Sequence, residues 1–478
     1  MGVFFLCVAL LIAGYFTYGA IVDRIFGSDP NRLTPAKTMA DGVDYVEMSP
    51  RKLFLVQLLN IAGLGPIFGP ILGALYGPSA LLWIVIGSIF AGAVHDYFSG
   101  MLSVRNGGKS VPDVVGQELG NGFKQFMRLF SIVLLLLVGV VFVLGPAKLL
   151  GSLTGWAVPV WVGIIFVYYF LATILPIDKI IGRIYPVFGA VLIFMAVGLT
   201  AALIFSGYNF YPELTLANLH PKELPLWPLM FITIACGAIS GFHATQSPMM
   251  ARCVANEKYG RPVFYGAMIG EGIIALIWAT LGMSFYNGSA ALGAALAKGG
   301  PSSVVNEIST TLLGPVGGIL AIIGVVILPI TSGDTAFRSA RLIVADFCKL
   351  QQKAPMKRLY LAVPLFVIGF LISRGNFDVI WRYFGWANQT LATIVLWASA
   401  AWLIKQAKLH WVATVPATFM TVVATTYLAY DKIGFGLSLS VSTIIGVSVA
   451  ALSLVTFLVK FRGASALPEE VATESGTA

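Results

Sequence analysis

The chain has 478 residues, of which 58% are hydrophobic and only 11% are charged. Because soluble domains usually carry about 25% charged residues, this composition argues against a water-soluble globular fold. The net charge of +9 does not indicate nucleic-acid binding, because apolar runs of about 20 residues separate the basic residues. The four cysteines form no CxxC pair, so we expect packing residues, with no disulfide framework or zinc knuckle.

Apolar stretches long enough to cross about 30 Å of hydrocarbon occur thirteen times along the chain. The predicted fold class is therefore an all-α polytopic membrane protein with thirteen transmembrane helices. The first stretch lacks a basic flank and runs into Asp23 and Arg24, so we expect a retained helix and not a cleaved signal peptide. The stretches are 2–22, 53–77, 79–103, 127–148, 157–176, 185–206, 226–250, 262–285, 315–340, 357–373, 380–403, 410–430 and 437–459.

The distribution of Lys and Arg predicts the orientation. With the N-terminus outside, the inner segments hold 24 of the 30 basic residues and the outer segments hold 6. Because short cytoplasmic loops are basic, we expect the N-terminus outside and the C-terminus in the cytoplasm.

Three connecting or terminal segments have their own expected structures. The inner loop 104–126 is either a solvated connector or a short interfacial helix that begins near Pro112. The outer segment 286–314 is either an ordinary loop or a lid on the membrane surface. Residues 463–478 have too little apolar content to pack and are expected to form a disordered tail.

Residues that a lipid-facing helix avoids interrupt the second and the seventh stretch. Backbone that leaves the helix at membrane depth must line a cavity or be buried in protein, so the two interruptions predict one shared site. The alternative for the glycines is close helix packing through GxxxG spacing. The interrupting residues are Gly63, Gly65, Pro66, Gly69 and Pro70 in the second stretch, and Gly237, Gly241 and Pro248 in the seventh.

Each break also predicts a chemistry. We expect half-helices to begin at Gly69-Pro70 and at Ser247-Pro248 and to present free N–H groups to an anion. Carbonyl groups freed before the breaks, at Ala62 and Gly63 or at Gly237 and Ala238, are expected to coordinate a cation. The predicted substrate-binding residues are Gly63, Gly65, Gly69, Gly241, His243, Thr245, Gln246 and Ser247.

The spacing of the interruptions predicts an inverted repeat. Five stretches begin with the second and five begin with the seventh, and because five is odd the second group starts on the opposite side of the membrane. The predicted repeats are residues 53–206 and 226–403. Residues 1–52 are then an extra helix with a cytoplasmic loop, and residues 410–462 are two extra helices.

Few ionisable side chains fall within the stretches, and each costs about 2.5 to 3.5 kcal/mol at membrane depth. We expect Asp96, His243, Glu271 and Asp334 to form a proton path. For His243 the alternative is a structural histidine, and for Glu271 a hydrogen-bonded strut. His95 is expected to be a capped or interfacial histidine, because adjacent helical residues point about 100° apart.

Hydroxyl groups in the ninth stretch predict a cation site. Thr331 and Ser332 precede Asp334 by about one turn, and with Ala62 they offer the oxygen ligands that a hard cation such as sodium prefers. The alternative is that these hydroxyls bond back to their own helix.

Three stretches carry a resemblance to a known family. GLGPIFGPILGALYG at 63–77, AGAVHDYFSGMLSVRNGGKSVPDVVGQELG at 91–120 and FITIACGAISGFHATQSP at 231–248 resemble the carbon starvation protein A family over most of 50–285. The resemblance implies a bacterial or archaeal inner-membrane carrier with the five-plus-five repeat of the amino acid–polyamine–organocation superfamily. It also implies uptake of peptides or pyruvate, and it puts Thr331 and Ser332 on the core eighth helix, where sodium-dependent relatives have hydroxyl ligands. Enterobacterial members extend further at the C-terminus, so the substrate stays open.

The sequence therefore predicts a symporter of the bacterial or archaeal inner membrane that uses protons or sodium to take up pyruvate, another small carboxylate or peptides by alternating access. The alternative is an uncoupled channel. We expect no enzyme activity and no cofactor, since the chain has no HExxH motif and no helical histidine pair. The expected partners are the lipid bilayer and the substrate, without nucleic acid, and the oligomeric state is left open.

Overall fold

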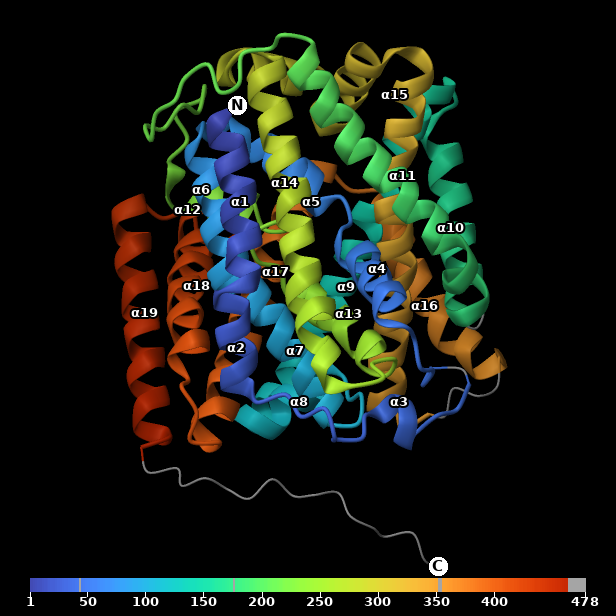
Figure 1. Ribbon diagram of the computed structural model, residues 1–478, viewed down its shortest axis with the longest axis vertical. Coiled ribbons are helices and arrows are strands. Elements are labelled where there is room, and N and C mark those ends of the chain that lie inside the picture. The colour runs from blue at the N-terminus through green and yellow to red at the C-terminus, as the bar shows by residue number, and fades with distance from the viewer. Residues whose placement is uncertain (43, 175–176, 351–354, 463–478) are drawn as a thin grey trace, which may run out of the picture.

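The computed structural model describes residues 1–42, 44–174, 177–350 and 355–462. These residues form helices and connecting loops, with no strand among them. The helices run roughly along one axis, with the N-terminus at one end of the bundle and the end of α19 at the other (Figure 1). The all-helical class predicted from the composition is thus confirmed.

Among the described residues, the first half of the chain contains twelve α-helices: α1 (Gly2–Phe16), α2 (Tyr18–Phe26), α3 (Pro35–Thr38), α4 (Pro50–Ile61), α5 (Gly65–Gly73), α6 (Ser79–Gly87), α7 (Ala93–Arg105), α8 (Val111–Leu119), α9 (Asn121–Thr154), α10 (Val158–Ile174), α11 (Ile177–Phe205) and α12 (Leu226–Thr233). The second half consists of α13 (Gly241–Ala251), α14 (Gly266–Phe285), α15 (Ser289–Phe347), α16 (Pro355–Ser373), α17 (Phe377–Lys405), α18 (Trp411–Tyr430) and α19 (Leu439–Lys460). Short 3₁₀ or π turns are η1 (Ala74–Tyr76), η2 (Ser88–Gly92), η3 (Glu257–Tyr259) and η4 (Arg261–Tyr265).

Ten helical segments of the described part are long and apolar enough to cross a membrane, or eleven if the bent pair α4–α5 is one span. Two of the predicted stretches fall short by this measure, because α10 is a shorter apolar helix and the seventh stretch is divided between α12 and α13. The number thirteen and the inverted repeat therefore stay predictions.

The first predicted interruption is present between α4 and α5. The two helices are bent by 52° relative to each other, and Ala62 after the end of α4 has non-helical backbone angles (φ −77°, ψ 71°). The half-helix α5 begins at Gly65, so the predicted start at Gly69-Pro70 is wrong. Pro66 already occupies the first turn, where its missing N–H removes no helical hydrogen bond.

The second interruption is present between α12 and α13. Ser240 is extended (φ −143°, ψ 120°) and precedes α13, so the predicted start at Ser247-Pro248 is wrong. The reason lies on another helix: the backbone N–H of Phe242 donates to Oδ1 of Asn388 on α17 at 2.6 Å. This side chain satisfies an N–H that a helix start leaves free, so α13 can begin before the serine.

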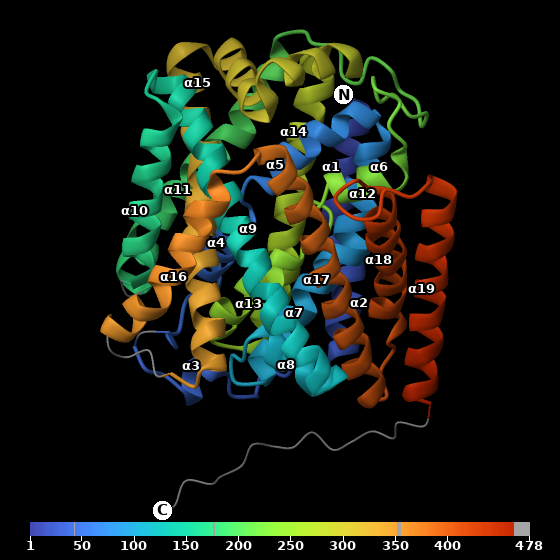
Figure 2. The same ribbon diagram turned by 180° about the vertical axis from the view of Figure 1, so that it is seen from behind.

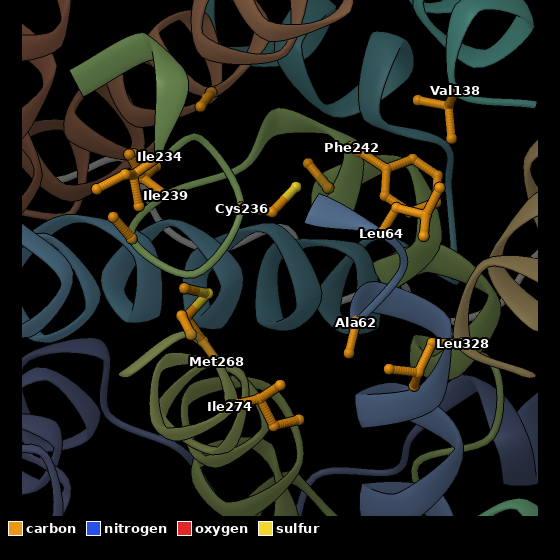
Figure 3. Close-up of a cluster of buried hydrophobic side chains, with 14 of the residues drawn as sticks. Ala62, Leu64, Val138, Ile234, Cys236, Ile239, Phe242, Met268, Ile274 and Leu328 are labelled. Carbon is orange, nitrogen blue, oxygen red and sulfur yellow. The ribbon is translucent and has the colours of Figure 1, made fainter. Parts of the chain in front are cut away.

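The two interruptions pack against each other inside the bundle. A Cβ atom on Gly65 would lie 2.1 Å from the Cβ of Cys236, so only glycine permits this approach. Figure 3 shows Ala62 and Leu64 of the first break in one cluster with Cys236 and Phe242 of the second. The predicted meeting of the two breaks is thus observed.

The predicted peripheral helices are also present. α8 begins at Val111 with Pro112 in its first turn, which confirms a helix in the loop 104–126. In α15, Gly300 and Gly314 have left-handed backbone (φ 69° and 68°) and divide off two helical pieces that cover part of the predicted segment 286–314. Both views show the first part of α15 at the end of the bundle that holds the N-terminus (Figures 1 and 2). The predicted tail 463–478 lies outside the described residues.

Candidate functional site

Three ionisable side chains from three helices meet beside the second break. Nδ1 of His243 lies 2.8 Å from Oδ2 of Asp96, and Nε2 of the same ring lies 3.2 Å from Oε2 of Glu271. All three side chains are fully buried. One imidazole therefore lies between two carboxylates, so three of the four residues expected to form a proton path meet here, and the path itself stays a prediction.

Local structure places each member of this group. His243 is in the first turn of α13, directly after the break, while Asp96 is in the first turn of α7 and Glu271 is on α14. Ser88 in the π turn η2 donates to the carbonyl of Gly237 at 2.7 Å and so holds the broken segment against the turn that precedes α7.

His95 belongs to the same network, contrary to expectation. It is fully buried, and its Nδ1 lies 2.8 Å from Oδ1 of Asp96. Although adjacent helical residues point in different directions, these two side chains fold toward each other, so that nitrogen and oxygen meet. Asp96 thus contacts two imidazoles, one through each carboxylate oxygen.

Asp334, the fourth predicted proton-path residue, has a different partner. Tyr168 on α10 donates to Oδ2 of Asp334 at 3.3 Å. No hydrogen bond or ion pair among the described residues joins Asp334 to His243 or to its two carboxylates. The four residues of the predicted proton path therefore do not all contact one another.

The hydroxyls predicted to bind sodium lie against the end of α4. Thr331 and Ser332 donate to the carbonyl of Leu59 at 3.0 and 3.1 Å, three residues before Ala62. Thr331 also lies 2.8 Å from the carbonyl of Leu328 in its own helix, as the alternative of bonding back to that helix expected, and the cation site stays a prediction. These oxygens are the candidate ligands for a hard cation beside the first break.

The predicted polar binding residues on α13 are hydrogen-bonded within the protein. Thr245 donates to the carbonyl of Phe242 at 2.6 Å, and Gln246 donates through Nε2 to Thr245 at 2.9 Å. Ser247 donates to the carbonyl of His243 at 3.0 Å. Oε1 of Gln246 is buried without a hydrogen-bond partner among the described residues, so this face keeps an unused acceptor.

The predicted binding glycines are closely packed. Gly63 faces the ring of Phe142, Gly69 faces the carbonyl of Thr233, and Gly241 faces the backbone of Asn388. Together with Gly65 they permit close approach between neighbouring segments. This agrees with the alternative expectation that the glycines serve close packing. In this conformation the site is closed around its own side chains.

Asn388 is the site residue that the sequence reasoning missed. Its Oδ1 accepts from Phe242, and its Nδ2 donates to Ser240 at 3.0 Å and contacts Sγ of Cys236 at 3.6 Å. A signal was available, because the neighbouring amides Asn388 and Gln389 stand inside the apolar stretch 380–403. A search confined to ionisable residues passes over them.

Cavities approach the site from two sides. A cavity of about 730 Å³ opens at the end of the bundle where α8 lies, and only a void of about 20 Å³ continues from it to Thr245. A cavity of about 250 Å³, lined by Tyr76, His220 and Trp381, lies beside the half-helices α5 and α12. The packed breaks separate the two. The charged lining residues of the large cavity include Lys109, Asp113, Lys124, Arg128, Arg252 and Asp346.

A family profile described as carbon starvation protein CstA matches residues 1–162, 147–310 and 287–427. The chain belongs to the carbon starvation protein CstA family. The three matched regions include all residues of the Asp96–His243–Glu271 network, and the resemblance noted from the sequence is confirmed.

Several relatives support this assignment. An uncharacterized membrane protein of Haemophilus influenzae is 51% identical over 62% of this chain and 94% of its own length. The peptide transporter CstA of Campylobacter jejuni is 27% identical over 89% of this chain and 79% of its own. The pyruvate/proton symporter BtsT of Escherichia coli is 28% identical over 56% of this chain and 47% of its own.

Solved structures show the fold of this CstA family member. MhsT in complex with L-phenylalanine has a TM-score of 0.55 at 15% identity, covering 87% of this chain and 99% of that chain. Mhp1, a nucleobase-cation-symport-1 family transporter, has a TM-score of 0.53 at 15% identity, covering 89% and 95%. The fold is thus shared with structurally known membrane transporters.

Proposed function

We propose that this protein is a secondary active transporter that couples a cation, in the first place a proton, to the uptake of a small carboxylate or a peptide. The observation that carries the proposal is His243, which lies between two buried carboxylates at a helix break. Ionisable groups at membrane depth are costly and mark ion or substrate paths.

The geometry of the imidazole supports a proton as the coupling ion. A histidine ring takes up and releases protons near neutral pH, and its two nitrogens are separate sites. Here one nitrogen faces Asp96 and the other faces Glu271, so a proton can enter from one carboxylate and leave toward the other. One of the curated relatives is named a pyruvate/proton symporter.

The broken helices support an anionic or amphoteric substrate. The start of α13 carries the partial positive charge of a helix N-terminus, which favours a carboxylate group, and the N–H of Phe242 there already binds the side-chain oxygen of Asn388. Pyruvate, another small acid and the carboxyl end of a peptide all offer such a group. The closed packing around the breaks fits the occluded stage of alternating access, and the predicted inverted repeat would supply the motion that opens either side in turn.

Sodium is the second candidate for the coupling ion. The hydroxyls of Thr331 and Ser332 and the carbonyl groups of Leu59 and Ala62 are hard oxygen ligands on two helices. Sodium binding there would replace the present hydrogen bonds to Leu59.

An uncoupled channel is the alternative. A channel needs a continuous polar path, whereas the cavities at the two sides of this site are separated by the packed breaks. We place the protein in a bacterial or archaeal inner membrane with the N-terminus outside, as the distribution of basic residues favours.

Uptake into proteoliposomes tests the proposal. Labelled pyruvate and a labelled dipeptide are offered separately, each under an inward proton gradient and under an inward sodium gradient. We expect accumulation of one substrate that a protonophore abolishes. Absence of gradient-driven accumulation of both substrates would refute the proposal, and unitary currents in planar bilayers would favour the channel.

A further inference from the structure

Three side chains with metal-ligating atoms meet at the second break. Cys236, His243 and Glu271 each offer one ligand atom, and these atoms all lie within 4.8 Å of one another. All three side chains are buried. We propose that this cluster binds a single divalent transition-metal ion of the Zn²⁺ type.

The spacing of the nitrogen and oxygen ligands fits tetrahedral coordination. Two ligand atoms about 2.0 Å from a tetrahedral Zn²⁺ ion are about 3.3 Å apart, and Nε2 of His243 lies 3.2 Å from Oε2 of Glu271. The thiolate bonds at about 2.3 Å and would lie about 3.5 Å from the other two ligand atoms, so separations that are now at most 4.8 Å need to shrink by up to about 1.3 Å. Cys236 lies in the non-helical segment between α12 and α13, where such a shift disrupts no helix.

The opposite side of the imidazole has the partner that a metal-bound histidine usually has. Nδ1 of His243 lies 2.8 Å from Asp96, and Asp96 is held in turn by His95. A carboxylate that accepts from one ring nitrogen fixes the tautomer and directs the lone pair of the other nitrogen toward the metal. Here that second nitrogen faces Glu271 and the thiol.

Polar atoms of the cluster remain available to a ligand. Nε2 of His243 and both carboxylate oxygens of Glu271 are buried, and none makes a hydrogen bond of normal geometry with a described residue. Buried polar atoms without such partners are costly, and a bound cation would satisfy them together. The mixed sulfur, nitrogen and oxygen set favours Zn²⁺ over Mg²⁺ or Ca²⁺, which prefer oxygen ligands alone.

Metal binding has a consequence for the transport cycle. A metal ion bound to Cys236, His243 and Glu271 would tie the second break to α14, so Zn²⁺ is expected to inhibit the movements of the transport cycle. This inhibitory effect rests on the proposed function. Binding of the metal does not rest on it, since it follows from the three ligands alone.

Cobalt spectroscopy of the purified full-length protein tests the site. Co²⁺ is added in detergent solution, and Zn²⁺ is then added as a competitor. We expect one Co²⁺ per chain with a thiolate-to-cobalt charge-transfer band that Zn²⁺ abolishes. Cys236→Ser should remove the band, whereas Cys253→Ser, which changes a buried thiol outside the cluster, should keep it. A band that persists in Cys236→Ser, or the lack of stoichiometric binding by the unaltered chain, would overturn the proposal.

Two further variants separate loss of a ligand from loss of the fold. Asp96→Asn keeps all three ligands and should weaken Zn²⁺ binding by roughly 10- to 100-fold, as the loss of an outer partner does. Glu271→Gln removes a ligand and should weaken it more. Size-exclusion profiles and melting curves of each variant show whether it is folded, and unchanged Zn²⁺ affinity in a folded Glu271→Gln would contradict the proposal.

Transport assays distinguish the two proposals. In proteoliposomes, Zn²⁺ should inhibit uptake by the unaltered chain, and residual uptake by Cys236→Ser should resist it. If the charge-transfer band depends on Cys236 but no substrate accumulates, the proposed function fails and the metal site stands. If uptake is proton-driven but the band is independent of Cys236, only the metal site fails.

Discussion

Replacing Asp96 by asparagine tests the proton network most directly. The carboxylate lies 2.8 Å from a ring nitrogen of His95 and 2.8 Å from one of His243, one contact through each oxygen. Asparagine keeps one acceptor oxygen and replaces the other by an NH₂ donor, so one of the two imidazoles loses its acceptor. The negative charge that favours a protonated His243 is lost as well.

The magnitude follows from the contacts. A hydrogen bond to a charged group contributes about 1.5 to 3 kcal/mol, which corresponds to roughly 10- to 150-fold in an equilibrium. We therefore expect Asp96→Asn to need an external proton concentration about 10- to 150-fold higher for half-maximal uptake. Exchange of labelled for unlabelled substrate without a gradient should persist, because it needs no net proton movement.

The assay measures initial uptake into proteoliposomes across a series of external pH values, followed by counterflow exchange. Asp113→Asn on α8 is the matched control, because it makes the same chemical change outside the network. If Asp96→Asn accumulates substrate with the pH profile of the unaltered chain, Asp96 has no part in proton coupling and the reasoning is refuted.

Three further predictions concern the breaks and the inner end of the bundle. Asn388→Ala removes the cap of α13 and should destabilise the protein by about 1 to 3 kcal/mol, seen as a lower melting temperature in detergent, and an unchanged melting curve would contradict the capping role. Thr331→Val removes a hydroxyl beside the first break and should abolish any stimulation of uptake by sodium while proton-driven uptake continues; sodium stimulation that survives would exclude this hydroxyl as a ligand. The third concerns Asp113 on α8: burial raises its pKa, but Lys124 at 2.7 Å, together with Ser110 and Arg128, outweighs the burial, so that the pKa is lowered overall. Because the folded pKa of Asp113 lies below the unfolded value near 3.9, the ionised carboxylate stabilises the folded protein above about pH 4, and this stabilisation is lost as the pH falls through the folded pKa. Hydrogen exchange of α8 should therefore accelerate in acid, and Lys124→Ala should reduce this acceleration; equal acceleration in both proteins would contradict the role of the ion pair.

The sequence was sufficient to find the interruptions but not the exact starts of the half-helices. Glycine and proline at 63–70 and 237–248 disrupt a helix locally, so their effect can be predicted from composition and spacing. The start of α13 depends on Asn388, which is 146 residues away from Phe242 in the chain. No local pattern around Ser247-Pro248 reveals a cap supplied by a distant helix.

The candidate site, too, could be predicted from the sequence only in part. Asp96, His243 and Glu271 could be selected because ionisable groups are costly in a membrane, and the structure brings these three together. Asp334 satisfied the same criterion but faces Tyr168. His95 was misjudged because the directions of Cβ atoms do not determine where side-chain ends meet. Cys236 could not be selected, because a thiol in an apolar stretch is ordinarily a packing residue.

In the proposed function, the one imidazole that lies between two carboxylates, that of His243, carries the coupling proton. One imidazole binds one extra proton, so each turnover is expected to move one proton inward with one substrate molecule. With a monovalent anion such as pyruvate no net charge would cross, and accumulation would follow the pH difference but not the voltage. With a zwitterionic dipeptide one positive charge would cross, worth about 2.3 kcal/mol per 100 mV, or roughly 50-fold in accumulation. The electrical response of uptake thus reports the charge of the cargo, even before its identity is known.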